Sequence, residues 1–247
     1  MPIYNIYKLY IDIVLIMYYN TFMIKEDNKY IALIADIVNS RKIQNREIFQ
    51  KEFINVIKNV NITFKDSIVS KFVITTGDEF QGLVSDARVI LDILTNIRFN
   101  LKNVNFRCGI GIGCIVTEID KNMAIGADGP AYYMARDAIN YVKKNENSNK
   151  KAKTDIVIYS DEDNVKLSYI NILFKNNYYL YNRMSEHQKY LVNYFILNDG
   201  VKEKDTSDLL KISQQSINKS LHSAGFYYYK ENYECIKKIM GELKNVN

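Results

Sequence analysis

The spacing of apolar residues predicts six elements in the first half of the chain. A continuous apolar run at residues 30–37 is typical of a strand that is buried on both faces. Apolar residues three and four positions apart predict amphipathic helices at 47–60 and 87–99. Two β-prone runs around a tight turn predict a hairpin over 70–84, and the Gly-rich, β-branched segment 106–117 predicts a fourth strand. The order β-α-β-β-α-β is that of a ferredoxin-like or palm core, so we expect an α+β fold.

One more helix and two more strands are predicted after this core. The segment 123–142 (MAIGADGPAYYMARDAINYV) contains a Gly-rich turn, and Pro130 lies where the first residue of a helix is expected. Strands are predicted at 155–159 and at about 177–181. These elements complete a first domain, for which we expect the boundaries 23–184.

The remainder of the chain, residues 185–247, is expected to be a small all-α domain. A helix is predicted to begin after Ser185, and two short helices are predicted at 206–211 and 214–224. The two short helices resemble a helix-turn-helix, in which the second helix enters the DNA major groove. The polar residues of that second helix that would contact DNA are Gln214, Gln215, Ser216, Asn218 and Lys219.

The charge of this C-terminal part leaves a second interpretation open. Residues 186–247 contain 9 Lys, no Arg and 8 acidic residues, so the segment lacks the strongly basic surface that phosphate binding requires. A helical bundle used for packing or dimerisation is therefore the alternative to a DNA-binding module.

The first 22 residues are treated separately as an N-terminal extension. Residues 9–17 are apolar, but Asp12 interrupts them and the run is shorter than the ~20 residues that span a bilayer, so we expect no stable membrane span. One interpretation is that natural translation starts at Met23 and the extension is not native. The other is a short segment that binds a membrane surface or a partner protein.

Composition places the chain among globular proteins. Of its 247 residues, 47% are hydrophobic and 25% charged, and the net charge of +5 is too mild to identify a ligand. Cys108 and Cys114 are expected to be small buried residues on one face of a strand, because the three cysteines show no metal-binding spacing. A reducing, cytoplasmic setting fits this cysteine content.

The segment Thr75-Thr76-Gly77-Asp78-Glu79-Phe80-Gln81 indicates a site. It places two acids at the tip of the predicted hairpin, where an acid alone commonly caps a turn. In the expected sheet the first strand lies antiparallel beside the third, which brings Asp36 close to Asp78. Paired carboxylates there favour a divalent metal ion. Arg136, on the helix that follows, is suited to the oxygens of a triphosphate.

The same residues resemble the nucleotidyl cyclase superfamily, which contains class III cyclases and GGDEF diguanylate cyclases. The matching segments are ADI at 35–37, GDEF at 77–80 and the helix around 127–136. Taken in order, ADIVNSR, ITTGDEFQGL, RCGIGIG and IGADGPAYYMARDAI resemble the SatD family of bacterial proteins.

This resemblance implies a set of site residues. It implies Mg²⁺ or Mn²⁺ as cofactor, with Asp36, Asp78 and Glu79 as metal ligands. It implies catalytic roles for Asp78 and Arg136.

The substrate contacts are also taken from the resemblance. Ser40 and Arg41 follow the first metal ligand, where both cyclase groups hold phosphates, and Arg136 lies at a phosphate-contacting position. Tyr132 replaces the Asn that orients the ribose in cyclases. Thr76 replaces the first Gly of GGDEF, which makes cyclic-di-GMP synthesis a poorer match.

Two functions follow as expectations. The first is a metal-dependent, nucleotide-binding enzyme of the nucleotidyl cyclase type, a phosphorus-oxygen lyase or nucleotidyltransferase that makes a cyclic nucleotide or a related signal from a nucleoside triphosphate. The alternative is a non-catalytic regulator that senses a nucleotide and whose C-terminal helices bind duplex DNA or a protein partner. The resemblance also implies a homodimer.

Overall fold

The computed structural model describes residues 29–102, 104–148, 150–160 and 165–243. The expectations for the N-terminal extension therefore lie outside the described residues. Within these ranges, no helix is both long enough and apolar enough to cross a membrane.

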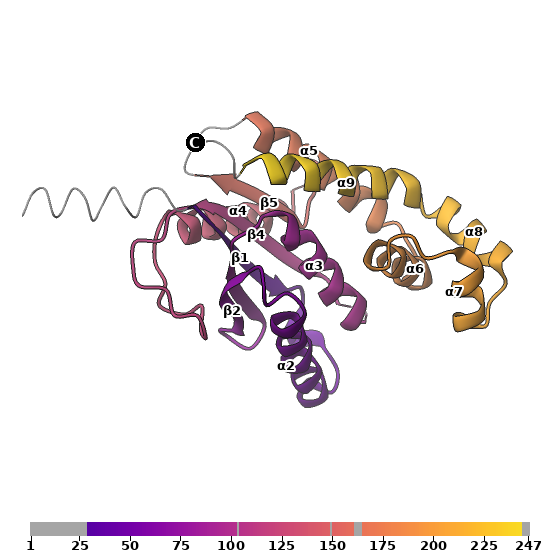
Figure 1. Ribbon diagram of the computed structural model, residues 1–247, viewed down its shortest axis with the longest axis horizontal. Coiled ribbons are helices and arrows are strands. Elements are labelled where there is room, and N and C mark those ends of the chain that lie inside the picture. The colour runs from indigo at the N-terminus through magenta and orange to yellow at the C-terminus, as the bar shows by residue number, and fades with distance from the viewer. Residues whose placement is uncertain (1–28, 103, 149, 161–164, 244–247) are drawn as a thin grey trace, which may run out of the picture.

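Five strands form one sheet, in the order β2-β3-β1-β4-β5 (Figure 1). β1 lies at its centre and pairs antiparallel with both β3 and β4, which confirms the predicted pairing of the first and third strands. β5 pairs parallel to β4 at one edge. The strand bounds are Tyr30–Ile37 (β1), Ile68–Ile74 (β2), Glu79–Val84 (β3), Phe106–Gly113 (β4) and Ile156–Ser160 (β5).

Helices connect and cover these strands, so the predicted α+β class is confirmed. The bounds are Ser40–Lys42 (the 3₁₀ helix η1), Arg46–Thr63 (α2), Arg88–Asn100 (α3), Pro130–Asn145 (α4), Val165–Tyr181 (α5), Glu186–Leu197 (α6), Glu203–Leu210 (α7), Gln214–Ser223 (α8) and Phe226–Glu242 (α9).

The sheet is covered on both faces, as the continuous apolar run of β1 predicted. Leu33 and its odd-numbered neighbours on β1 pack into the larger hydrophobic cluster, with α2, α3 and the C-terminal helices. Ala32 and Ile34 point to the opposite face, where they pack against Ala131 and Ala135 of α4. Because side chains alternate along a strand, Asp36 belongs to the α4 face.

Glycines of β4 bring α4 unusually close to the sheet. A Cβ atom built on Gly111 would lie 2.0 Å from the carbonyl oxygen of Ala131, and one on Gly109 would lie 2.1 Å from that of Ala135. Only glycine leaves room for the helix backbone at these two positions. α4 is therefore fixed directly over β4, and the side chains along its length reach the edge where β1 ends.

The C-terminal helices share the core of the sheet. The larger hydrophobic cluster runs without interruption from β1 and α3 into α5, α6, α8 and α9, across the expected boundary at residues 184 and 185. Tyr233 of α9 donates a hydrogen bond to Asp92 of α3 at 2.7 Å, and Lys237 adds an ion pair to the same carboxylate. α9, which the sequence analysis did not anticipate, thus ties the end of the chain to α3.

Two predictions about strands were wrong. The segment predicted as a strand at about 177–181 is the last part of α5, which buries Leu167, Ile170 and Phe174 at helical spacing. Its tyrosines have a high β propensity, but burial of the helix face outweighs that preference. The strand predicted at 106–117 ends at Gly113, so Cys108 is buried in it whereas Cys114 lies beyond it and is only partly buried.

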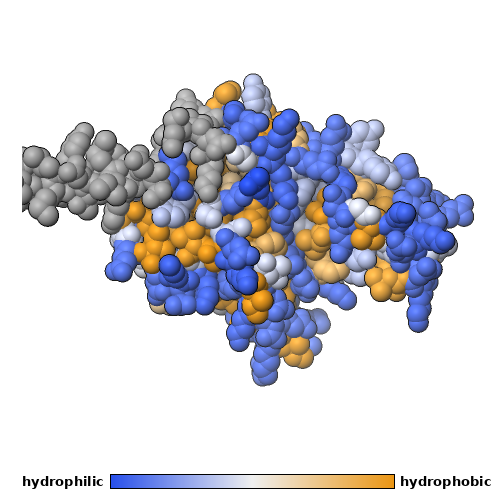
Figure 2. All heavy atoms as spheres, viewed as in Figure 1, coloured by the Kyte–Doolittle hydropathy of each residue, from blue (hydrophilic) through white to orange (hydrophobic). Residues whose placement is uncertain are grey.

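The surface is mixed in character. Figure 2 shows hydrophilic residues over most of one face, with smaller hydrophobic patches between them. Exposed apolar side chains occur on several elements, among them Ile62 of α2, Tyr179 of α5 and Tyr228 of α9. Scattered apolar exposure of this kind is ordinary for a folded protein.

Candidate functional site

Three acids meet where β1 ends and β3 begins. Asp36 of β1 and Glu79 of β3 are register partners, so their side chains project from the same face of the sheet, towards α4. The backbone N–H of Ile37 donates to the carbonyl oxygen of Asp78 at 3.0 Å, which places the hairpin turn beside the end of β1. Asp36 and the Gly77-Asp78 turn therefore lie next to each other, as the sequence predicted. Glu79 is the cross-strand partner of Asp36.

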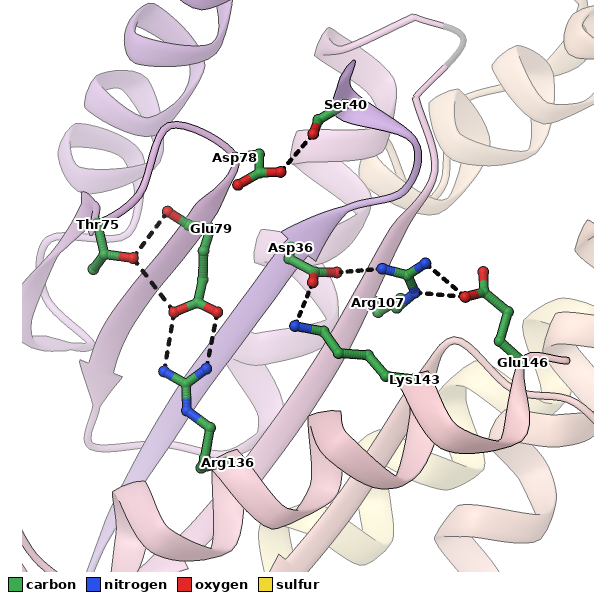
Figure 3. Close-up of polar contacts among 9 residues, drawn as sticks. All are labelled: Asp36, Ser40, Thr75, Asp78, Glu79, Arg107, Arg136, Lys143 and Glu146. Atoms are coloured by element: carbon green, nitrogen blue, oxygen red, sulfur yellow. Dashed lines mark hydrogen bonds and ion pairs between the residues drawn. The ribbon is translucent and has the colours of Figure 1, made fainter. Parts of the chain in front are cut away.

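Asp36 lies between two cations. Its Oδ1 accepts a hydrogen bond from Arg107 Nη1 at 3.2 Å, and its Oδ2 lies 2.5 Å from Lys143 Nζ (Figure 3). Arg107 is itself held by Glu146 of α4, with Nη2 2.6 Å from Oε2. The Asp36 side chain is only 12% exposed, so these contacts replace most of its hydration.

Glu79 is held by Arg136. The guanidinium donates from Nη1 to Oε2 at 2.8 Å and from Nη2 to Oε1 at 3.0 Å, the two-bond geometry that suits arginine and a carboxylate. Burial by itself would raise the pKa of Glu79, but the hydrogen bonds and charge of Arg136, assisted by the charge of Lys143, lower that pKa below its ordinary value. Glu79 is therefore an ionised carboxylate at neutral pH.

Asp78 has a different partner. Its Oδ2 accepts a hydrogen bond from Ser40 Oγ at 2.5 Å, so the turn and the loop after β1 are joined by side chains as well as by backbone. Ser40 is buried and begins the short helix η1, and Asn39 before it has the left-handed φ of 56°. Arg41, expected to contact phosphate, follows Ser40 in η1 and is exposed.

Tyr132 lies in the core between α4 and the sheet. It is 7% exposed and belongs to the cluster that contains Ile34 and Leu83. Its hydroxyl is buried and finds no hydrogen-bond partner among the described residues, and burial raises the pKa of this phenol. Tyr132 was expected to contact the substrate. The structure places its side chain beneath α4 instead, one helical turn before Arg136.

Three charged residues of the site were missed by the sequence analysis. Arg107 and Lys143 contact Asp36, and Glu146 holds Arg107; the quoted segment RCGIGIG contains Arg107, but no role was assigned to it. A signal was present for Lys143, which follows Arg136 by seven residues and so lies two helical turns along the same face. Arg107 shares the strand parity of Gly109 and Gly111, which also predicts that it faces α4.

The donor set is compatible with a hard divalent cation that is partly coordinated by substrate. Among the described residues, no group of three or more His, Cys, Asp or Glu side chains is arranged to hold a metal ion by itself. Mg²⁺, however, is commonly bound by one or two carboxylates together with phosphate oxygens and water. Asp36 and Glu79 are register partners that project from one face, so they supply the two carboxylates that such a site needs.

The family of the chain is established by comparison with family models. The SatD family model matches residues 30–240, most of the chain. The chain belongs to the SatD family. The predicted membership is confirmed, and no curated protein matches this SatD-family chain.

Two solved structures of cyclases are similar to this SatD-family chain. The guanylyl cyclase Cya2 is 13% identical, with 46% of this chain and 70% of that chain covered and a TM-score of 0.36. A bacterial light-regulated adenylyl cyclase is 12% identical, with 53% of this chain and 74% of that chain covered and a TM-score of 0.34.

The residues expected to contact DNA lie on α8 of this SatD-family chain. Gln214, Gln215, Ser216 and Lys219 are exposed. Asn218 is partly buried, and its Nδ2 donates to Glu203 of α7 at 3.2 Å. Its amide therefore joins α7 to α8.

Proposed function

We propose that this SatD-family protein binds a nucleoside triphosphate together with Mg²⁺ or Mn²⁺ at the Asp36–Glu79 edge of the sheet, and converts it to a cyclic nucleotide or a related signal. One observation carries the proposal: Asp36 and Glu79 project from one face, and Arg107, Arg136 and Lys143 converge on them. Such an arrangement complements a metal–triphosphate complex, which presents both positive and negative charge to the protein.

The present ion pairs support an exchange of partners on binding. The side chains of Lys143 and Arg136 are 36% and 43% exposed, whereas those of Asp36 and Glu79 are 12% and 14% exposed. The cations are therefore the accessible members of each pair. Asp36 and Glu79 would hold a divalent ion as their counter-charge, and Lys143 and Arg136 would then be available to phosphate oxygens without leaving a buried charge unpaired.

The chain's own residues then divide the work. Arg136 and Lys143 bind and orient the triphosphate, and Arg107 holds the Asp36 side chain in place while Glu146, its second partner, fixes the guanidinium. Ser40 fixes the turn that carries Asp78. A bound divalent ion would neutralise charge on the α-phosphate and activate the attacking 3′-hydroxyl of the nucleotide, the chemistry of a nucleotidyl cyclase or nucleotidyltransferase.

The sheet supports a palm-type assignment of the fold. The β2-β3-β1-β4 part of the strand order, with α2 and α3 on one face, supports this proposal. A homodimer is part of the same proposal, because it follows from the resemblance to cyclases, and multi-angle light scattering of the purified chain tests it.

The decisive experiment measures binding and turnover separately. Binding of each nucleoside triphosphate in the presence of Mn²⁺ is measured by equilibrium dialysis, and turnover is measured by chromatography of the products and quantification of released pyrophosphate. Asp36→Asn and Glu79→Gln should abolish both signals, whereas Glu47→Gln, a carboxamide change on exposed α2, should leave them unchanged. Nucleotide binding without pyrophosphate release would exclude the enzyme, and loss of neither signal in the two variants would exclude the site.

A nucleotide-sensing regulator is the second candidate, and the exposed polar face of α8 supports it. α7 and α8 are short and consecutive, as in a helix-turn-helix, and Gln214, Gln215 and Lys219 are all exposed. Full-length protein should then bind duplex DNA in a salt-dependent manner, and Gln215→Ala with Lys219→Ala should weaken binding relative to Lys238→Ala on α9. Equal binding by these variants would leave α7 and α8 as packing elements or as a surface for a protein partner.

A further inference from the structure

A cavity between the end of α3 and one face of α6 lies apart from the proposed nucleotide site. Its volume is about 340 Å³, within the range of ~300–1,000 Å³ that is common for small-molecule sites. Glu186, Lys189, Tyr190 and Asn193 of α6 line it at spacings of three and four residues, so a whole polar and aromatic face of the helix is turned towards it. Its walls belong both to the sheet layer and to the C-terminal helices.

Aromatic rings form much of the wall. Phe99 of α3 stacks on Tyr190 of α6 with ring centroids 5.1 Å apart, and Tyr181 from the end of α5 lines the same cavity. The Tyr181 ring carries Arg98 at 4.9 Å and Lys189 at 5.6 Å from its centroid. The cavity thus offers flat apolar surface beside positive charge, which suits a planar ligand with an anionic group.

Lys189 is the cation best placed to bind that group. Its side chain is 16% exposed, and its Nζ is paired at 2.7 Å with Glu186, whose side chain is 60% exposed. An anion inside the cavity would therefore compete with a carboxylate that is free to turn into solvent. Desolvated ammonium groups bind anions more strongly than exposed ones, because water screens them less.

A buried amide orients the Tyr181 hydroxyl at the wall of the cavity. Asn193 is 2% exposed, and its Nδ2 donates to the Tyr181 hydroxyl at 2.9 Å, but its Oδ1 finds no partner among the described residues. Among the described residues the Tyr181 hydroxyl accepts this bond and donates none, so its proton is available to a ligand acceptor.

We propose that this cavity is a binding site for a small planar aromatic anion, held by Lys189, Tyr181 and the Phe99–Tyr190 wall. The site is separate from the proposed nucleotide site, because Asp36, Glu79 and their cationic partners are not among the residues that line the cavity. Its ligand needs no metal ion. A ligand bound there would contact α3 and α6 together, because both helices contribute walls.

The test uses 8-anilino-1-naphthalenesulfonate, a planar aromatic anion whose fluorescence rises in apolar surroundings. Full-length protein is titrated in buffer that contains EDTA, and we expect saturable binding of one probe per chain. Lys189→Met keeps the apolar stem and removes the charge, and it should weaken binding about tenfold. Lys51→Met is the matched control, because Lys51 also pairs at 2.7 Å with a glutamate on its own helix, and it should bind as the wild type does.

A second measurement on the wild-type chain locates the probe. The side-chain amide signals of Asn193 are identified in a ¹H–¹⁵N spectrum by their loss in Asn193→Leu, and they should shift when the probe is added. Asp36→Asn should bind the probe with unchanged affinity, so failure of the nucleotide site leaves this result intact. Equal affinity of Lys189→Met and Lys51→Met, or unmoved Asn193 signals at saturation, would overturn the proposal.

Discussion

Arg136 of α4 and Glu79 of β3 form a two-bond ion pair, with Nη1–Oε2 and Nη2–Oε1 distances of 2.8 and 3.0 Å. The pair joins the helix over the sheet to the strand that follows the Gly77-Asp78 turn. Arg136 therefore has a protein partner at the edge where the sequence predicted a phosphate contact. We interpret the pair as a resting arrangement in which the carboxylate and the guanidinium neutralise each other.

Replacement of Arg136 tests this interpretation. Arg136→Met should raise the dissociation constant of a non-hydrolysable nucleoside triphosphate with Mn²⁺ about tenfold or more, because a charge-assisted contact is lost. Arg136→Lys restores the charge but not the two-bond geometry, so an intermediate constant is expected. Isothermal titration calorimetry measures the dissociation constants of the wild type, Arg136→Met and Arg136→Lys. Arg88→Met, which removes an arginine paired with Asp86 on the surface, is the control, and an equal effect of both Met variants would contradict the assignment.

The lowered pKa of Glu79 predicts a pH dependence of stability. Its folded-state pKa lies below the ordinary value of 4.5, so ionised Glu79 stabilises the fold. This contribution is fully present above the unfolded-state pKa and is lost as the pH falls through the folded-state pKa. The free energy of unfolding, measured with urea, should therefore differ more between wild type and Glu79→Gln at pH 7 than at pH 3. A difference that is independent of pH would show that the carboxylate charge has no such role.

The close approach of α4 to β4 predicts a sensitive position at Gly111. In Gly111→Ala, the new Cβ would lie 2.0 Å from the Ala131 carbonyl oxygen and 2.3 Å from the Ala135 amide nitrogen, so the helix must move. We expect the free energy of unfolding to fall by about 3 kcal/mol. Gly241→Ala is the matched control within α9, because the nearest atom to its Cβ is Cδ of the flexible Arg88 side chain at 3.0 Å. That variant should be neutral or more stable by at most about 1 kcal/mol, as helix propensity predicts.

The largest single cost of removing a charge is expected at Arg98. This residue forms an ion pair with Asp155, and the side chains are only 10% and 18% exposed. Burial raises the pKa of Asp155 even with the opposing charge of Arg98 beside it. Arg98→Met should therefore lower the free energy of unfolding by about 3 kcal/mol, because it leaves a buried carboxyl group unpaired.

A double-mutant cycle distinguishes this pairing from general loss of packing. Asp155→Asn combined with Arg98→Met should destabilise the protein by less than the sum of the two single changes, with a coupling of about 1 kcal/mol or more. Strict additivity in thermal or urea unfolding would show that the two charges do not interact.

Local patterns were sufficient for most of the secondary structure. The apolar run of β1, the Pro130 start of α4 and the Ser185–Gln188 capping box of α6 are each properties of a few neighbouring residues. The fixed φ of Pro130 and the satisfied N–H groups of the capping box act within one turn of chain, and the apolar run of β1 is a local mark of a strand that is buried on both faces. The segment 177–181 was mispredicted because its tyrosines favour a strand locally, while packing of α5 against β5 and α9 is not local.

By itself, the sequence determined the candidate acids, Asp36 and Asp78, and the pairing of strands that brings them near each other. Only the tertiary structure decided which charges neutralise them. Arg107 and Lys143 are both far from Asp36 in sequence. Arg107 reaches it as its register partner across β1 and β4, and Lys143 reaches it because glycines of β4 allow α4 to lie directly on the sheet. Electrostatic contacts of this kind depend on distances between elements, which no local pattern of residues encodes.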